Sequence, residues 1–149
     1  PEEGKYHYDG HRKCGVRFSP EETKKSNGVC PVCQKNVTVG VDNRIHSLAD
    51  RPSDYVNPSA KKVEYIIPLV EIIAEIRGVK STASKNVIQT YDAVITSLGN
   101  EFDVLRTLPV QSISEAGFPE LAEAVKRMRK KEIQVEPGYD GVFGTVKVF

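Results

Sequence analysis

The stretch that decides the fold runs from His11 to Cys33 and reads HRKCGVRFSPEETKKSNGVCPVC. It contains all three cysteines of the 149-residue chain, and with the preceding histidine their spacing is H-x2-C-x15-C-x2-C. Structural zinc sites use four sulfur or nitrogen ligands in a tetrahedron, and two close pairs on two tight turns supply them. The pattern therefore predicts one structural zinc ion bound by His11, Cys14, Cys30 and Cys33.

The fourth ligand of this predicted site has alternatives. His7 and His46 are the other two histidines, and Asp9 offers a carboxylate oxygen. His11 is favoured because it lies two intervening residues before a cysteine, as in a tight turn that carries two ligands. A catalytic zinc keeps one coordination position open for water, whereas four protein ligands leave none, so we expect a structural role.

The C-x2-C pair also has a redox interpretation. A thioredoxin-type motif precedes a helix N-terminus, whereas the residues that follow Cys33 lead into a β-prone segment. The odd number of cysteines also argues against a disulfide framework and for a reducing compartment, so we expect a cytoplasmic protein. The cysteines are therefore predicted to bind metal.

Composition restricts the class of protein to which the chain can belong. The formal net charge is +1, 39% of the residues are hydrophobic and 7% are aromatic. No apolar run reaches the roughly 18–20 residues of a membrane span, so no membrane partner is expected. The first residues lack a methionine, a basic region and an apolar region, so we expect no signal peptide and regard the chain as a piece of a longer protein.

The predicted fold class is α+β, in three parts. Residues 1–49 are expected to form a zinc-binding, ribbon-like β module with short strands near 15–18 and 37–41. Residues 50–62 contain two prolines and no apolar periodicity, which is typical of a linker. Residues 63–149 are predicted to form a helical domain that ends in a strand, a turn and a strand, near 133–135 and 145–149.

Helix signals within the predicted helical domain are clear. Apolar residues recur at steps of three and four within 68–77 and 84–98, and the second helix has Ser84 as N-cap and Gly99 beyond its end. A shorter helix is predicted over 100–106 and a last one from Pro119 to the basic residues 126–131.

Six stretches resemble the endonuclease Q family of PHP-domain DNA repair nucleases. They are GKYHYDGHRKCGV (4–16), SPEE (19–22), GVCPVC (28–33), IPLVEIIAE (67–75), LGNEFDVL (98–105) and PGYDGVFG (137–144). The resemblance implies the C-terminal, zinc-binding and helical portion of an endonuclease that nicks DNA 5′ to deaminated bases. It places the metal-dependent PHP catalytic domain upstream, and the chain itself contains no comparable histidine and carboxylate cluster. We therefore predict no catalytic residues here and no activity from this chain alone.

DNA is the partner that the resemblance implies. Near the first pair of ligands, aromatic and cationic side chains alternate in a combination suited to stacking bases and holding phosphates. The candidate DNA-contacting residues are Tyr6, Tyr8, Arg12, Lys13 and Arg17. The first hypothesis is thus a zinc-stabilised part that binds DNA and positions the substrate.

Two other function classes stay open at this point. One is a structural or interaction module that packs on the PHP domain of the same polypeptide without touching DNA. The other is a self-contained metalloenzyme, which would act without upstream residues. The basic residues 126–131 could also bind phosphates, or they could simply favour the negative end of their helix.

Overall fold

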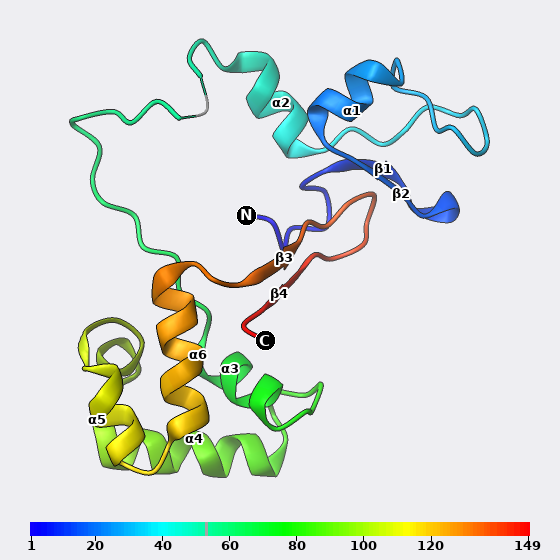
Figure 1. Cartoon of the computed structure of the whole chain (residues 1–149). Helices are drawn as coiled ribbons and strands as arrows, with labels where there is room; N and C mark the ends of the chain where they lie inside the picture. The colour runs from blue at the N-terminus through cyan, green and yellow to red at the C-terminus, as the bar shows by residue number, and fades with distance from the viewer. Residues whose placement is uncertain (53) are drawn as a thin grey trace. The chain divides into compact units, whose positions relative to one another are not determined.

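The computed structural model describes residues 1–52 and 54–149 (Figure 1). These residues divide into two compact units. Unit 1 comprises Pro1–Lys62 and Val135–Val146, and unit 2 comprises Val63–Gln134 and Lys147–Phe149. Helices and two small two-stranded sheets occur together, which confirms the predicted mixed class.

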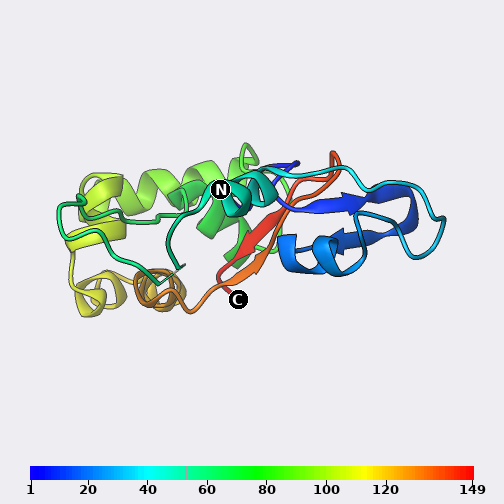
Figure 2. The same cartoon turned by 90° about the horizontal axis from the view of Figure 1, so that it is seen from above.

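Unit 1 is built on a short antiparallel hairpin. Strand β1 (Asp9–His11) pairs with β2 (Val16–Phe18), so that His11 lies opposite Val16. A 3-10 turn, η1 (Arg12–Cys14), joins the strands, and Gly15 ends this turn with a φ of 66°. Because this left-handed conformation is unfavourable for side chains with a Cβ, glycine suits the position after Cys14. Figure 2 shows the two strands side by side with the first helix next to them.

Two helices of unit 1 lie where short strands and turns were predicted. Helix α1 (Pro20–Lys25) begins with a capping box, in which Ser19 and Glu22 accept each other's backbone N–H groups. Helix α2 (Val41–Leu48) begins at the end of the predicted strand 37–41. That strand prediction is wrong: within it Thr38 forms only an isolated bridge to Gly10. The alternating valines resembled a strand, but Val41 already belongs to the helix.

Unit 2 contains a conventional hydrophobic core. Helices α3 (Leu69–Ile76), α4 (Lys85–Leu98) and α6 (Pro119–Lys130) match the predicted helices. Helix α3 packs on both α4 and α6. Many of the fully buried side chains come from the predicted apolar faces, among them Leu69, Ile72, Val87, Val94 and Val125. Ile88 of the predicted stripe is instead 42% exposed, and the buried Ile113 lies on a helix that was not predicted.

The segment between α4 and α6 differs from the prediction. Residues Asp103–Thr107 form a π-helix, η2, where a short α-helix was expected. An additional helix, α5 (Val110–Glu115), follows Pro109 and packs against α6. The guanidinium of Arg129 donates to the carbonyls of Val104, Leu105 and Leu108, so that α6 satisfies acceptors at the end of the π-helix. Short helices of this kind depend on such partners rather than on their own periodicity.

The last two strands connect the units covalently. Strands β3 (Gln134–Glu136) and β4 (Thr145–Lys147) pair with each other, as predicted. The loop between them was assigned to the helical domain, but residues 135–146 group with unit 1. The described residues of the predicted linker 50–62 contain no helix or strand, and Ser53 lies outside the described residues.

Candidate metal centre

Two tight turns of unit 1 carry the four predicted metal ligands. His11 ends β1 and Cys14 ends η1, so the first pair lies on the turn of the hairpin. Cys30 and Cys33 lie on a second turn, which the N–H of Gln34 closes by donating to the carbonyl of Cys30 at 2.9 Å. Gln34 has a φ of 59°, and a pairing of Val29 with Asn36 holds the ends of this turn together.

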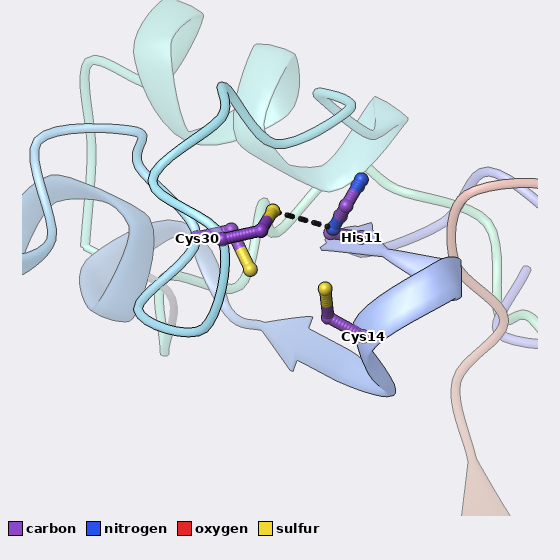
Figure 3. Close-up of side chains that lie close together, drawn as sticks. His11, Cys14 and Cys30 are labelled. Carbon is purple, nitrogen blue, oxygen red and sulfur yellow. Dashed lines mark hydrogen bonds between the residues drawn. The ribbon is translucent and has the colours of Figure 1, made fainter.

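The four side chains gather at one point. Their potential ligand atoms all lie within 4.8 Å of one another. The side chains of His11, Cys14 and Cys30 point toward a common space, and the dashed line marks the contact of 3.4 Å between His11 Nδ1 and Cys33 Sγ (Figure 3). This group can hold one metal ion, as the spacing predicted.

These distances suit tetrahedral zinc. Zinc–sulfur bonds of about 2.3 Å and zinc–nitrogen bonds of about 2.0–2.1 Å place neighbouring ligand atoms of a tetrahedron roughly 3.5–3.8 Å apart. The 3.4 Å between His11 Nδ1 and Cys33 Sγ is close to that edge. Three sulfurs and one imidazole form a common donor set of closed structural zinc sites. The residues present therefore fit one zinc ion.

The surroundings of the thiols differ. Burial acts to raise the pKa of Cys30, but hydrogen bonds from the backbone N–H groups of Cys33 and Val32 outweigh it and lower the pKa to about 7. Burial raises the pKa of Cys14 to about 11, together with the neighbouring thiols of Cys33 and Cys30. Binding of a metal cation would favour the thiolate form, because metal binding displaces the thiol proton.

The alternative fourth ligands are engaged elsewhere. The ring of His7 stacks on Tyr8 with 5.3 Å between their centroids. His46 lies on α2, where its Nδ1 is 3.7 Å from a carboxylate oxygen of Asp42. Asp9 is fully buried and accepts hydrogen bonds from the N–H of Gly40 and the amide of Asn43. Among the described residues, His11 is the histidine that lies with the cysteines.

Four of the five predicted DNA-contacting residues lie at the loop 137–144. Arg17 donates to the carbonyl of Pro137 at 3.3 Å. The hydroxyl of Tyr6 and the guanidinium of Arg12 lie close to Gly141, because a Cβ added at Gly141 would be 3.5 Å from the first and 3.6 Å from the second.

Two further candidates lie in the same part of unit 1. The backbone N–H of Tyr8 donates to the carbonyl of Gly138 at 2.8 Å, while its ring is half-buried. Lys13 is exposed on η1. Four of the five predicted residues therefore contact or adjoin a loop more than 110 positions away in the sequence.

Asp140 is a residue of this region that the sequence did not reveal. Its carboxylate accepts from the backbone N–H of Arg12 and from the hydroxyl of Thr38, each at 2.6 Å. The hydrogen bond from Thr38 lowers the pKa of Asp140, as does that from Arg12, although partial burial opposes them. Asp140 thus ties the loop to the first residue of η1, the turn that ends at Cys14. Its position in a glycine-rich stretch predicted only a turn.

The basic residues 126–131 mostly have partners within unit 2. Lys126 and Arg127 pair with Glu123, and Arg129 donates to the three carbonyls beside the π-helix. Lys130 lies 4.0 Å from Glu132, and the ammonium of Lys131 lies over the ring of Tyr65. These contacts favour the structural interpretation of this stretch over phosphate binding.

Unit 1 is thus a zinc-ribbon-like module whose centre combines one histidine with three cysteines, and unit 2 is a small helical bundle. Residues 68–132 match the family model of the MJ0043 C-terminal domain. Uncharacterized protein MJ0043 of Methanocaldococcus jannaschii is 33% identical over 147 residues, which are 98% of this chain and 18% of that protein.

Two solved structures of endonuclease Q are similar to the whole chain. The lesion-specific endonuclease PfuEndoQ from Pyrococcus furiosus superimposes with a TM-score of 0.83 at 28% identity. A complex of endonuclease Q with a 27-mer duplex substrate, which has an abasic lesion at the active site, gives 0.75 at 29% identity. Each match covers 99% of this chain and 36% of the other. The chain is therefore similar to a C-terminal part of endonuclease Q, which confirms the predicted resemblance, and it spans about a third of that enzyme.

No helix among the described residues is long and apolar enough to cross a membrane.

Proposed function

We propose that this chain is the zinc-stabilised, DNA-binding part of a DNA repair endonuclease that nicks 5′ to deaminated bases. In this proposal unit 1 contacts DNA and positions it for a PHP catalytic domain elsewhere in the same polypeptide. The chain alone would bind DNA without cutting it, because the candidate metal centre among its described residues has four protein ligands and offers no open position for water.

One observation carries the proposal. The exposed cations Arg12, Lys13 and Arg17 lie on the hairpin that holds two of the zinc ligands, and Tyr6 adjoins them. Cations neutralise phosphates and aromatic rings stack on bases, so this surface combines both requirements of single-strand binding. The similarity to endonuclease Q supports DNA as the ligand.

Fluorescence anisotropy over a salt series tests this function. The zinc-loaded chain is titrated against labelled single-stranded and duplex DNA, with and without one uracil. The charge-reversal variant Arg12→Glu/Lys13→Glu/Arg17→Glu should reduce the salt slope on single strands by roughly 2, because each phosphate contact contributes about 0.7. The control Lys80→Glu/Lys85→Glu/Lys147→Glu has the same change of charge on exposed lysines of unit 2 and should bind normally. An unchanged affinity of the first variant would contradict the proposal.

A second candidate function is docking on another part of the polypeptide. Helix α2 is anchored through its polar face, where Asn43 binds the buried carboxylate of Asp9. Its apolar residues Val41, Ile45 and Leu48 are between 55% and 64% exposed and recur at helical spacing. An exposed apolar stripe with few charges suits a protein interface better than a phosphate backbone.

The occupant of this face in our proposal is the PHP domain. Calorimetric titration of the separately produced PHP domain with this chain should show binding that Ile45→Asp abolishes. The same substitution should leave the affinity for DNA unchanged, so the two candidate functions are separable. Equal binding by the Ile45→Asp variant would rule out this face.

A further inference from the structure

The loop 137–144 carries an exposed aromatic side chain. Phe143 is 69% exposed, although most of the other residues in this loop are at least half-buried. The ammonium of Lys5 lies 5.6 Å from the centre of its ring and 5.9 Å from that of Tyr6. Two exposed rings with a cation near both form a surface that combines stacking with positive charge.

The backbone that presents Phe143 is held on both sides. The N–H groups of Gly138, Gly141 and Gly144 donate to the carbonyls of residues 2, 5 and 3 at 2.8–3.0 Å. A Cβ at Gly138 would lie 2.5 Å from backbone atoms of residues 4 and 144, so only glycine allows this close approach. Together with the hydrogen bonds of Asp140, these contacts fix the loop, and a fixed loop loses little conformational entropy when a ligand binds.

An open groove lies beside Phe143. It has a volume of about 490 Å³, within the range of small-ligand sites. The residues that line it include Tyr139, Val142, Arg17 and Glu136. The groove thus has aromatic and aliphatic walls with one cation and one anion.

We infer that Phe143 and this groove receive an unstacked base of single-stranded DNA, whose backbone follows Lys5 and Arg12. The inference rests on the proposed DNA-binding function and adds a stacking side chain that the sequence did not reveal. The carboxylate of Glu136 repels phosphate, so the uncharged base rather than the backbone lies in the groove. The ammonium of Lys5 lies beside the ring of Phe143 and Arg17 lines the groove, so cations are near the phosphates on either side of a stacked base.

The test compares DNA with and without bases. Anisotropy is measured with a labelled dT oligonucleotide and with an oligonucleotide of the same length made of abasic units. The wild-type chain should prefer the dT strand, and Phe143→Ala should weaken binding to it by roughly 5- to 100-fold, the loss typical of one stacking aromatic side chain. Binding to the abasic strand and the salt slope should stay the same, because no phosphate contact is removed.

Two further variants serve as controls. Phe143→Tyr retains a ring and should preserve the preference for dT. Phe102→Ala removes an exposed phenylalanine of unit 2, which is 59% exposed, and should have no effect. The zinc content of each variant reports whether unit 1 is folded.

The possible results separate the inference from the function on which it rests. Wild-type binding with an unchanged Phe143→Ala variant would overturn the stacking site and leave the DNA-binding surface intact. Equal wild-type affinity for the dT and abasic strands would do the same. Failure of the wild-type chain to bind any DNA at low salt would overturn both proposals.

Discussion

The two units are stabilised in different ways. Among the described residues, the buried apolar side chains of unit 1 are Cys30 and Val37, whereas unit 2 buries sixteen, from Ile67 to Val148. Unit 1 instead contains the candidate metal centre, the buried carboxylate of Asp9 and the hydrogen-bonded loop 137–144. With so few buried apolar side chains, unit 1 has little hydrophobic core, and small domains of this kind usually rely on metals or disulfides.

The difference separates the sources of stability. Metal binding to a closed zinc site is coupled to folding, because the ligand set does not exist in the unfolded chain, so we expect a bound ion to stabilise unit 1. Unit 2 relies on apolar burial and close packing, which need no ion. Removal of the metal should therefore leave unit 2 folded, and a cavity in the core of unit 2 should leave unit 1 folded.

The largest effect is expected from losing a metal ligand. Cys30→Ser should abolish zinc binding and unfold unit 1, since structural zinc contributes on the order of 10–16 kcal/mol in small modules. Zinc content and hydrogen exchange by mass spectrometry check this, with protection lost in residues 6–45 and kept in α3, α4 and α6. The control Val32→Ser alters an exposed residue of the same turn and should retain the metal. Loss of protection in both units at once would refute their independence.

A cavity in the core of unit 2 should destabilise unit 2 and leave the metal centre of unit 1 intact. Ile72 is fully buried on α3, so Ile72→Ala should lower the free energy of unfolding of unit 2 by about 2–5 kcal/mol. Chemical denaturation followed by circular dichroism measures this loss, while the zinc content should not change. Ile88→Ala on α4 is the matched control, because Ile88 is 42% exposed. A similar loss from both substitutions would mean that the core does not lie on these helix faces.

A smaller loss is expected from the polar network of unit 1. Asp9→Ala leaves the N–H of Gly40 and the amide of Asn43 without their acceptor, which should cost about 1–3 kcal/mol. Hydrogen exchange should increase in α2 first, because both donors lie at the start of that helix. Asp50→Ala is the control, because it removes an exposed carboxylate just beyond α2 and should leave exchange in the helix unchanged. Unchanged exchange in α2 would show that Asp9 does not anchor it.

The smallest effect concerns a pH-dependent hydrogen bond in unit 2. Tyr91 donates to Glu101 at 3.1 Å, and this hydrogen bond raises the pKa of Tyr91 above its ordinary 10.0. A raised pKa means that the neutral phenol stabilises the fold below pH 10 and that this contribution is lost as the pH rises through the folded-state pKa. Wild type should therefore be slightly more stable than Tyr91→Phe at pH 8, and the difference should vanish at higher pH. A difference independent of pH would contradict the assignment.

Helix prediction succeeded where the signals are local. Helix α4 has Ser84 at its N-cap, an apolar stripe at helical spacing and Gly99 beyond its last residue, and the structure follows all three. Helix α2 was missed because Val37, Val39 and Val41 alternate like the residues of a strand and because the apolar face of the helix is exposed. The residue that anchors it, Asp9, lies more than 30 positions earlier, so no short sequence window contains the reason for the helix.

Local sequence predicted the four residues of the candidate metal centre and much of the core of unit 2. Two ligand pairs on tight turns and the periodicity of apolar residues are both properties of short stretches, which act whatever the rest of the chain does. The tertiary structure alone brings the loop 137–144 against residues 2–12 and places Tyr6, Arg12 and Arg17 beside that loop. Arg12 and Asp140 are 128 positions apart. Contacts at that separation depend on backbone hydrogen bonds and close glycine packing, which leave no pattern in the local sequence.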